Sequence, residues 1–325
     1  MTTLYLDRRD LALKLEGQAL AIYADNARQT TVPLHLLERI VMRSSVSVQS
    51  GALARLADGG VSVLLFGGWN GSKVAALLGP GHNDAVRRIG QYRCYDDPEW
   101  CRDWSRRLVL AKVQGQSRLI QRAIIQRPDR RHPLTETHRR LKTIRARLRG
   151  ETALSIDSLR GLEGAAAAAH FAGLAVLLPE SLGFAGRNRR PPRDPFNAVL
   201  SLGYTLLHHE ATRACHVAGL DPAIGYFHEP AFGRASLAAD LIEPLRPRLD
   251  GWAWEQFRTR TLTADHFVRD GSACLLGKAG RGHFFRAYEP FARPARRWLR
   301  RVTTRVAAHL GQVGQGPSDH RGQTE

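Results

Sequence analysis

The first 80 residues show short apolar and alternating segments separated by turn residues. This pattern predicts strands over residues 3–6, 11–15, 20–23, 39–42 and 61–66, a helix over 48–57 that ends at Asp58-Gly59-Gly60, and a tight turn at Asn70-Gly71. We therefore expect residues 1–79 to form a small β-rich, β-sandwich-like domain.

Gly79-Pro80-Gly81-His82 interrupts this pattern, and we expect residues 80–90 to be a linker. Beyond it, apolar residues recur at helical spacing, which predicts an all-α domain over residues 91–310. Ser155 or Asp157 can cap one helix, and Asp194-Pro195 has the residues that open another. Residues 311–325 have few apolar side chains and are expected to be disordered. The predicted class is α+β.

The charge of the chain points to a polyanionic partner. Lys and Arg number 48 against 30 Asp and Glu, which gives a net charge of +18, and most of the excess is arginine. Arginine binds phosphate oxygens in a bidentate manner, so nucleic acid is the favoured partner, ahead of an anionic membrane or no partner. No apolar run approaches the roughly 20 residues of a membrane span. The first ten residues lack the apolar core of a signal peptide, so the expected location is the cytoplasm.

The stretch from Gly219 to Asp250 carries the most informative chemistry. His228 follows an aromatic pair on a loop, and Ser236 can cap a helix that carries Asp240 and Glu243, three positions apart. Two carboxylates buried side by side need a cation nearby, and oxygen ligands with one imidazole suit Mg²⁺ or Mn²⁺. A solvated acidic pair is the usual reading of such spacing, but here both acids have apolar neighbours.

Three blocks of this sequence resemble the signature of the CRISPR-associated spacer-acquisition integrases, the "Cas one" family. The first block comprises Gly225 to His228, Gly233-Arg234, Ser236-Leu237, Asp240-Leu241, Glu243-Pro244 and Arg246-Pro247. The others are Arg160 to Gly164 with the following alanines and His170-Phe171, and Asp194-Pro195 with Asn197 and Gly203-Tyr204. The family usually has tyrosine where His170 stands.

The resemblance implies a metal site made by Glu163, His228 and Glu243, with Asp240 as a further catalytic carboxylate and Mg²⁺ or Mn²⁺ as the cofactor. Without it, Glu163 on an alanine-rich helix would be read as a surface residue. Six arginines near the blocks are candidate DNA phosphate contacts: Arg160, Arg187, Arg189, Arg190, Arg234 and Arg246.

The implied function is that of a metal-dependent DNA endonuclease and integrase of CRISPR adaptation, the spacer-acquisition step of antiviral defence. It would join prespacer 3′-hydroxyl ends to the repeat by transesterification, with double-stranded prespacer and repeat DNA as substrates. The implied assembly is a homodimer that forms a heterohexamer with a small ferredoxin-like CRISPR subunit, without a membrane. Two alternatives remain: a structure-specific DNA repair nuclease and a catalytically silent nucleic-acid-binding scaffold.

Overall fold

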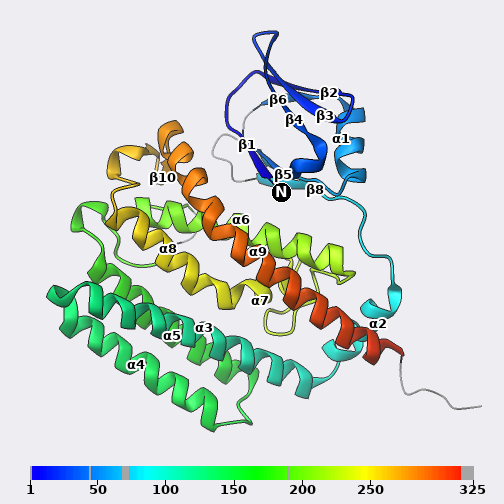
Figure 1. The fold of residues 1–325 in the computed structure, drawn as a ribbon. Helices are drawn as coiled ribbons and strands as arrows, with labels where there is room; N and C mark the ends of the chain where they lie inside the picture. Colours follow the sequence, from blue (N-terminus) through cyan, green and yellow to red (C-terminus); the bar gives the residue numbers. More distant parts are fainter. Residues whose placement is uncertain (1, 44, 68–72, 189–190, 316–325) are drawn as a thin grey trace, which may run out of the picture. The chain divides into compact units, whose positions relative to one another are not determined.

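The computed structural model describes residues 2–43, 45–67, 73–188 and 191–315. The chain divides into two compact units, Met1–His82 and Asn83–Glu325 (Figure 1). The first is built from strands and the second mainly from helices, so the α+β class is confirmed. The predicted turn at Asn70-Gly71 lies outside the described residues.

One sheet of the first unit has the strand order β1-β5-β7-β8. Its strands are β1 (Thr2–Leu6), β5 (Leu37–Met42), β7 (Ser62–Gly67) and β8 (Lys73–Leu77). β5 pairs in parallel with β1 and β7, and β8 closes the sheet antiparallel to β7. β5 is buried along almost its whole length, as expected for a central parallel strand.

The second sheet has the order β4-β3-β2-β6. Its strands are β2 (Leu11–Glu16), β3 (Ala19–Ala24), β4 (Ala27–Pro33) and β6 (Val46–Val48). Asp25 and Asn26 both adopt positive φ angles, 52° and 59°, which suits a two-residue turn between β3 and β4. The sequence does not predict β4, because its residues are polar and mostly exposed. The strand is defined by its backbone pairing with β3 and not by an apolar face.

Apolar side chains of both sheets and of helix α1 (Ser50–Asp58) form one core in the first unit. The fully buried members include Leu13 and Leu20 from the second sheet, Ile40 and Val63 from the first, and Leu56 from α1. The prediction of a β-rich unit is confirmed, and a β-sandwich geometry stays a prediction.

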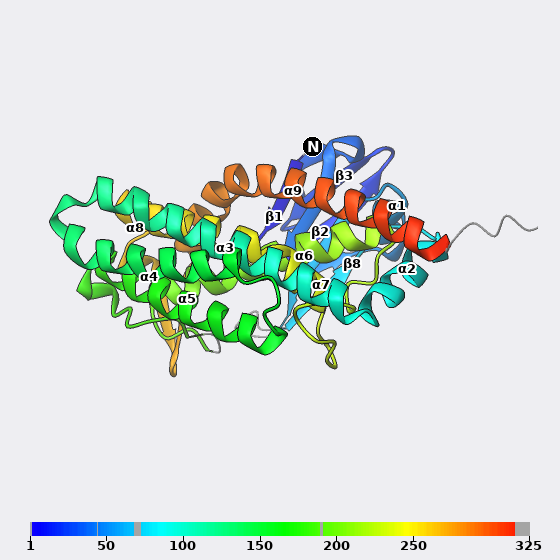
Figure 2. The same cartoon turned by 90° about the horizontal axis from the view of Figure 1, so that it is seen from below.

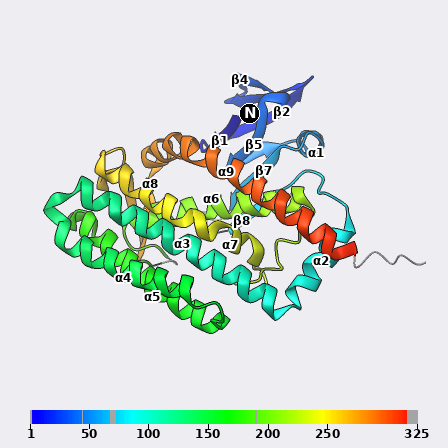
Figure 3. The same ribbon diagram turned by 60° about the horizontal axis from the view of Figure 1, so that its bottom comes forward.

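The second unit contains helices α2 to α9 (Figures 1 and 2). They are α2 (Ala85–Tyr95), α3 (Pro98–Gln126), α4 (Arg131–Gly150), α5 (Ile156–Leu177), α6 (Pro195–Ala218), α7 (Ser236–Ile242), α8 (Arg246–Arg258) and α9 (Lys278–Gln315). Short 3₁₀ turns connect several of them, including η4 (Glu243–Leu245) between α7 and α8. Helices α3, α4 and α5 lie side by side, and α9 packs against α2 and α6 (Figure 3).

Side-chain caps explain where several helices begin. Ser155 caps α5 by accepting a hydrogen bond from the backbone N–H of Ser158, and Asp194 caps α6 by accepting one from Asn197. Asp84 caps α2 in the same way. The expected linker over residues 80–90 is therefore wrong beyond Asp84, because this cap starts a helix there.

The expectation of an all-α second domain is also wrong in detail. Strands β9 (Phe267–Asp270) and β10 (Ala273–Leu276) form an antiparallel hairpin between α8 and α9. Gly271 adopts a φ of 56° at its turn, and the N–H of Cys274 donates a hydrogen bond to the carbonyl of Pro192. Backbone pairing thus stabilises four-residue strands that are too short to give a periodic sequence signal.

Helix α9 continues to Gln315, past residue 310 where disorder was expected to begin. The guanidinium of Arg93 donates to the carbonyls of Val313 and Gly314, which satisfies backbone groups at the end of the helix. Gly314 also packs so closely against α2 that an added Cβ would lie 2.0 Å from the carbonyl oxygen of Val86. The expectation is therefore wrong for residues 311–315, while residues 316–325 lie outside the described part of the chain.

The four cysteines, Cys94, Cys101, Cys215 and Cys274, are free and buried. Burial raises the pKa of Cys94 and of Cys101 to about 11, which disfavours the thiolate. Among the described residues, none of the helices combines the length and apolar character required to cross a membrane.

Candidate functional site

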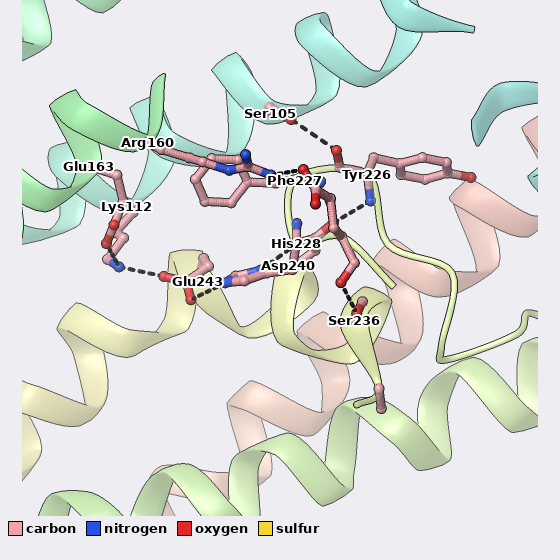
Figure 4. A network of polar contacts seen from close by, with 12 residues as sticks. Ser105, Lys112, Arg160, Glu163, Tyr226, Phe227, His228, Ser236, Asp240 and Glu243 are labelled. Atoms are coloured by element: carbon pink, nitrogen blue, oxygen red, sulfur yellow. Dashed lines mark hydrogen bonds and ion pairs between the residues drawn. The ribbon is translucent and has the colours of Figure 1, made fainter. Parts of the chain in front are cut away.

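The loop that carries His228 is held by one buried carboxylate. Asp240 on α7 accepts hydrogen bonds from the backbone N–H groups of Tyr226 (2.8 Å), Phe227 (3.0 Å) and His228 (3.0 Å). Its Oδ1 also lies 2.7 Å from the imidazole Nδ1 of His228. The side chain of Asp240 is completely buried, so this single group fixes both the loop backbone and the orientation of the imidazole (Figure 4).

Two further contacts shape this loop. An added Cβ at Gly225 would lie 2.6 Å from the carbonyl carbon of Ser236, so only glycine fits there. Ser236 does not cap α7 as expected; it is the first helical residue, and its hydroxyl donates to the carbonyl of Glu229. The Ser236 hydroxyl therefore links the first turn of α7 to the loop that carries His228.

Because Asp240 accepts from Nδ1, the proton of a neutral imidazole resides there and Nε2 keeps its lone pair. That nitrogen lies 3.9 Å from Oε1 of Glu243. Glu243 begins the 3₁₀ turn η4 directly after α7, and its side chain is 5% exposed. Asp240 and Glu243 are thus both buried, but Asp240 supports His228 whereas Glu243 faces its free nitrogen.

Glu243 is ionised despite its burial. Burial raises its pKa, but Arg246 and Lys112 outweigh that effect and hold the pKa at about 2. The Nε of Arg246 lies 2.6 Å from Oε1 of Glu243, and the Nζ of Lys112 lies 2.5 Å from Oε2. The site therefore contains a fixed negative charge at neutral pH.

Glu163 reaches the same place from α5. Its carboxylate forms an ion pair with the ammonium of Lys112 on α3, and the same ammonium contacts Glu243 (Figure 4). Lys112 therefore links Glu163 to Glu243, which lies beside His228, although 65 residues separate Glu163 from His228 in the sequence. Lys112 was not predicted, although it shares a buried helical face with Leu108, Val109 and other apolar residues of α3.

A second layer of contacts supports Arg246. Its guanidinium lies over the ring of Tyr204, 4.6 Å from the ring centre, and the Tyr204 hydroxyl donates to Asp250. The other oxygen of Asp250 lies 2.9 Å from Nε2 of His170, which is fully buried. His170 on α5 is thus connected to Arg246 through Asp250 and Tyr204.

The predicted phosphate-binding arginines occupy different environments. Arg234 is exposed, and Arg160 is 40% exposed while paired with Asp157 and Glu229. Arg187 is partly buried and donates to Asn197 and Ser201, whereas Arg246 is engaged with Glu243. Arg189 and Arg190 lie outside the described residues. A role of all six in DNA binding stays a prediction.

The donors suit a hard divalent cation. Two glutamate carboxylates and a neutral imidazole nitrogen, with the imidazole oriented by a buried aspartate, match the ligands and supporting contacts of Mg²⁺ or Mn²⁺ sites. Within the described part of the chain, no group of three or more His, Cys, Asp or Glu side chains is arranged to hold a metal ion. In the described arrangement, the Lys112 ammonium contacts both glutamates.

Comparison with known proteins gives one consistent family. Residues 4–290 match the family model described as CRISPR associated protein Cas1. CRISPR-associated endonuclease Cas1 1 of Thermodesulfovibrio yellowstonii is 34% identical over 91% of this chain and 93% of its own length. CRISPR-associated endonuclease Cas1 2 of Rhodospirillum rubrum is 35% identical over 91% of this chain and 88% of its own length.

Solved structures share the fold. A casposase bound to an integration product superposes with a TM-score of 0.80 at 20% identity, over 96% of this chain and 91% of that chain. A CAS1 protein from Thermotoga maritima gives a TM-score of 0.79 at 22% identity, over 95% and 97% of the two chains. A chain of a Cas6-RT-Cas1–Cas2 complex gives a TM-score of 0.79 at 22% identity, over 96% of this chain and 35% of that chain. From its sequence and its fold, this chain belongs to the Cas1 family of CRISPR-associated proteins.

Proposed function

We propose that this chain is a metal-dependent DNA integrase and endonuclease of CRISPR adaptation. The observation that carries the proposal is that Lys112 contacts both Glu163 and Glu243 while Nε2 of His228 lies 3.9 Å from Glu243, in a member of the Cas1 family. The names of the sequence relatives, which are endonucleases, and the casposase bound to an integration product support the same chemistry.

The proposed reaction is a transesterification. A DNA 3′-hydroxyl oxygen forms a bond to phosphorus in the target strand, and the bond from that phosphorus to the leaving oxygen breaks. A divalent ion at this site would polarise the phosphoryl oxygen and stabilise the leaving oxygen. Glu163 and Glu243 would supply anionic oxygens to it, and His228 would supply Nε2. Asp240 holds that nitrogen in place, and Arg246 balances the charge of Glu243.

The positive charge of the chain fits the proposed substrate, double-stranded prespacer and repeat DNA. Arg160 forms an ion pair with Glu229, the residue after His228, and Arg234 follows the same loop in sequence; the first is partly exposed and the second exposed. With Arg187, Arg189, Arg190 and Arg246 they are the proposed phosphate contacts. We also propose that the chain forms a homodimer that assembles with a small ferredoxin-like subunit into a heterohexamer. A Cas6-RT-Cas1–Cas2 complex among the similar structures supports an assembly with a partner subunit.

A strand-transfer assay tests the proposal. The chain, with its small partner subunit, is incubated with a labelled duplex bearing free 3′-hydroxyl ends, a supercoiled repeat plasmid and Mn²⁺ or Mg²⁺. We expect joined product with metal, none with EDTA, and a loss of at least about a hundredfold with Glu163→Gln, since such ligands stabilise several kcal/mol of transition-state charge. Glu99→Gln, at an acid that is 85% exposed on α3, is the matched control.

The other outcomes identify the alternatives. Cleavage of branched DNA without joined product would support a structure-specific repair nuclease. Salt-dependent DNA binding with neither cleavage nor joining would support a catalytically silent scaffold. Activity that survives Glu163→Gln unchanged would contradict the proposed site whatever product is formed.

A further inference from the structure

Lys112 is a buried lysine on the inner face of helix α3. Its side chain is 10% exposed, and its helical neighbours Leu108, Val109 and Val113 are buried as well. Lysine is rarely buried unless a charged partner compensates for the lost hydration of its ammonium. The position of Lys112 therefore requires a specific role for its charge.

The partners of Lys112 are the two proposed acidic metal ligands. Its ammonium contacts Glu163 on α5 and lies 2.5 Å from Oε2 of Glu243 on η4 (Figure 4). Two carboxylates that both contact one ammonium would repel each other if that cation were absent. Arg246 contacts the other oxygen of Glu243, so Lys112 is the cation that joins Glu243 to Glu163.

We propose that Lys112 is a built-in counter-ion that holds Glu163 and Glu243 together in the metal-free chain and is displaced from between them when a divalent cation binds. This inference rests on the proposed metal site. Two positive charges cannot share the same pair of carboxylate oxygens without strong repulsion. The four-carbon stem of lysine is flexible, so its ammonium can move away while the backbone of α3 stays in place.

The proposal has a consequence for affinity that differs from that of a supporting residue. A residue that supports the ligands strengthens metal binding, whereas a competing counter-ion weakens it. Removing the ammonium should therefore tighten binding of the divalent ion, because the ion no longer has to displace a resident charge. The same change should destabilise the metal-free protein, because Glu163 and the buried Glu243 then repel each other without compensation.

The test is Mn²⁺ binding to the full chain by isothermal titration calorimetry, without DNA. We expect Lys112→Met, a neutral substitution of similar length, to lower the Kd for Mn²⁺ by about tenfold, within the usual range of coupling between two binding events. Lys142→Met, at an exposed lysine on α4, should leave the Kd unchanged. Adding Glu163→Gln to Lys112→Met should remove the gain, because one of the two carboxylates is then lost.

Thermal unfolding gives the second readout. In EDTA, Lys112→Met should have a lower Tm than the unsubstituted chain, and saturating Mn²⁺ should raise its Tm by a larger amount than it raises that of the unsubstituted chain. Lys112→Arg, which keeps the charge, should bind Mn²⁺ no more tightly than the unsubstituted chain. If Lys112→Met does not fold in EDTA, the Kd of Lys112→Arg for Mn²⁺ is the measurement that tests the proposal.

An unchanged or raised Kd in Lys112→Met, or a lowered Kd in Lys112→Arg, would overturn the proposal. These results are distinct from failure of the proposed function. If the unsubstituted chain and Lys112→Met both fail to bind Mn²⁺, the metal site itself is refuted. If the unsubstituted chain binds Mn²⁺ and joins DNA while Lys112→Met gains no affinity, only the counter-ion role is refuted.

Discussion

Asp240→Asn perturbs the site at its most connected group while preserving the side-chain shape. The carboxylate accepts from four N–H groups, two at each oxygen: the backbone N–H groups of Tyr226 and Phe227 at Oδ2, and the backbone and imidazole of His228 at Oδ1. An asparagine offers one oxygen and one NH₂ group. Two of the four donors therefore lose their acceptor, whichever way the amide is turned.

Each buried donor left without an acceptor costs about 1–3 kcal/mol, so the substitution should lower the free energy of unfolding by about 2–6 kcal/mol. The imidazole also loses the charged group that fixes its orientation and tautomer. Loss of such a supporting contact typically weakens metal binding by about 10- to 100-fold. The two effects share one cause and should appear together.

Urea unfolding in EDTA measures the first effect, and Mn²⁺ titration of the folded protein measures the second. Asp265→Asn, at an exposed aspartate, is the control and should change stability by less than about 0.5 kcal/mol. If Asp240→Asn stays within that same range and binds Mn²⁺ as tightly as the unsubstituted chain, Asp240 does not hold the loop and the reasoning fails.

Three further predictions concern Glu243, Gly225 and Gly90. The pKa of Glu243 is lowered from 4.5 to about 2, so its ionised form contributes about 3 kcal/mol to the free energy of unfolding. This contribution is present above pH 4.5 and is lost as the pH falls through 2. Unfolding measured against pH should show the loss in the unsubstituted chain and not in Glu243→Gln. Gly225→Ala should displace the loop and abolish strand transfer, because its Cβ would lie 2.6 Å from the carbonyl carbon of Ser236; full activity in a folded Ala variant would contradict the close contact. Gly90→Ala should separate α2 from the end of α9, because its Cβ would lie 1.8 Å from the carbonyl oxygen of Leu310. The backbone amides in the last turns of α9 should then lose protection from hydrogen exchange, whereas those of α4 should keep it.

Local signals in the sequence determined where several elements begin. Ser155 and Asp194-Pro195 mark helix starts because a capping side chain acts on N–H groups two or three residues away. The same kind of local signal is present at Asp84, which caps α2. Strands β4, β9 and β10 gave little signal, because the first is polar and the other two are only four residues long.

The sequence also determined part of the candidate site. His228, Asp240 and Glu243 lie within 16 residues of one another, so their proximity follows from a short loop and a helix. The different contacts of Asp240 and Glu243 do not follow from their spacing. Only the fold decides that Asp240 turns toward the loop backbone and Nδ1 while Glu243 faces Nε2, because η4 follows α7 and changes the direction of the chain between them.

Glu163 and Lys112 belong to the part that only the tertiary structure decided. On their own helices they are a lone acid and a lone base, and the resemblance to a family, not the spacing, singled out Glu163. They meet because α3 and α5 pack against each other, so that charges 51 residues apart form one ion pair beside a third charge on η4. Helix caps depend on a few neighbouring residues, whereas this cluster depends on the packing of whole helices, which no short segment of the sequence encodes.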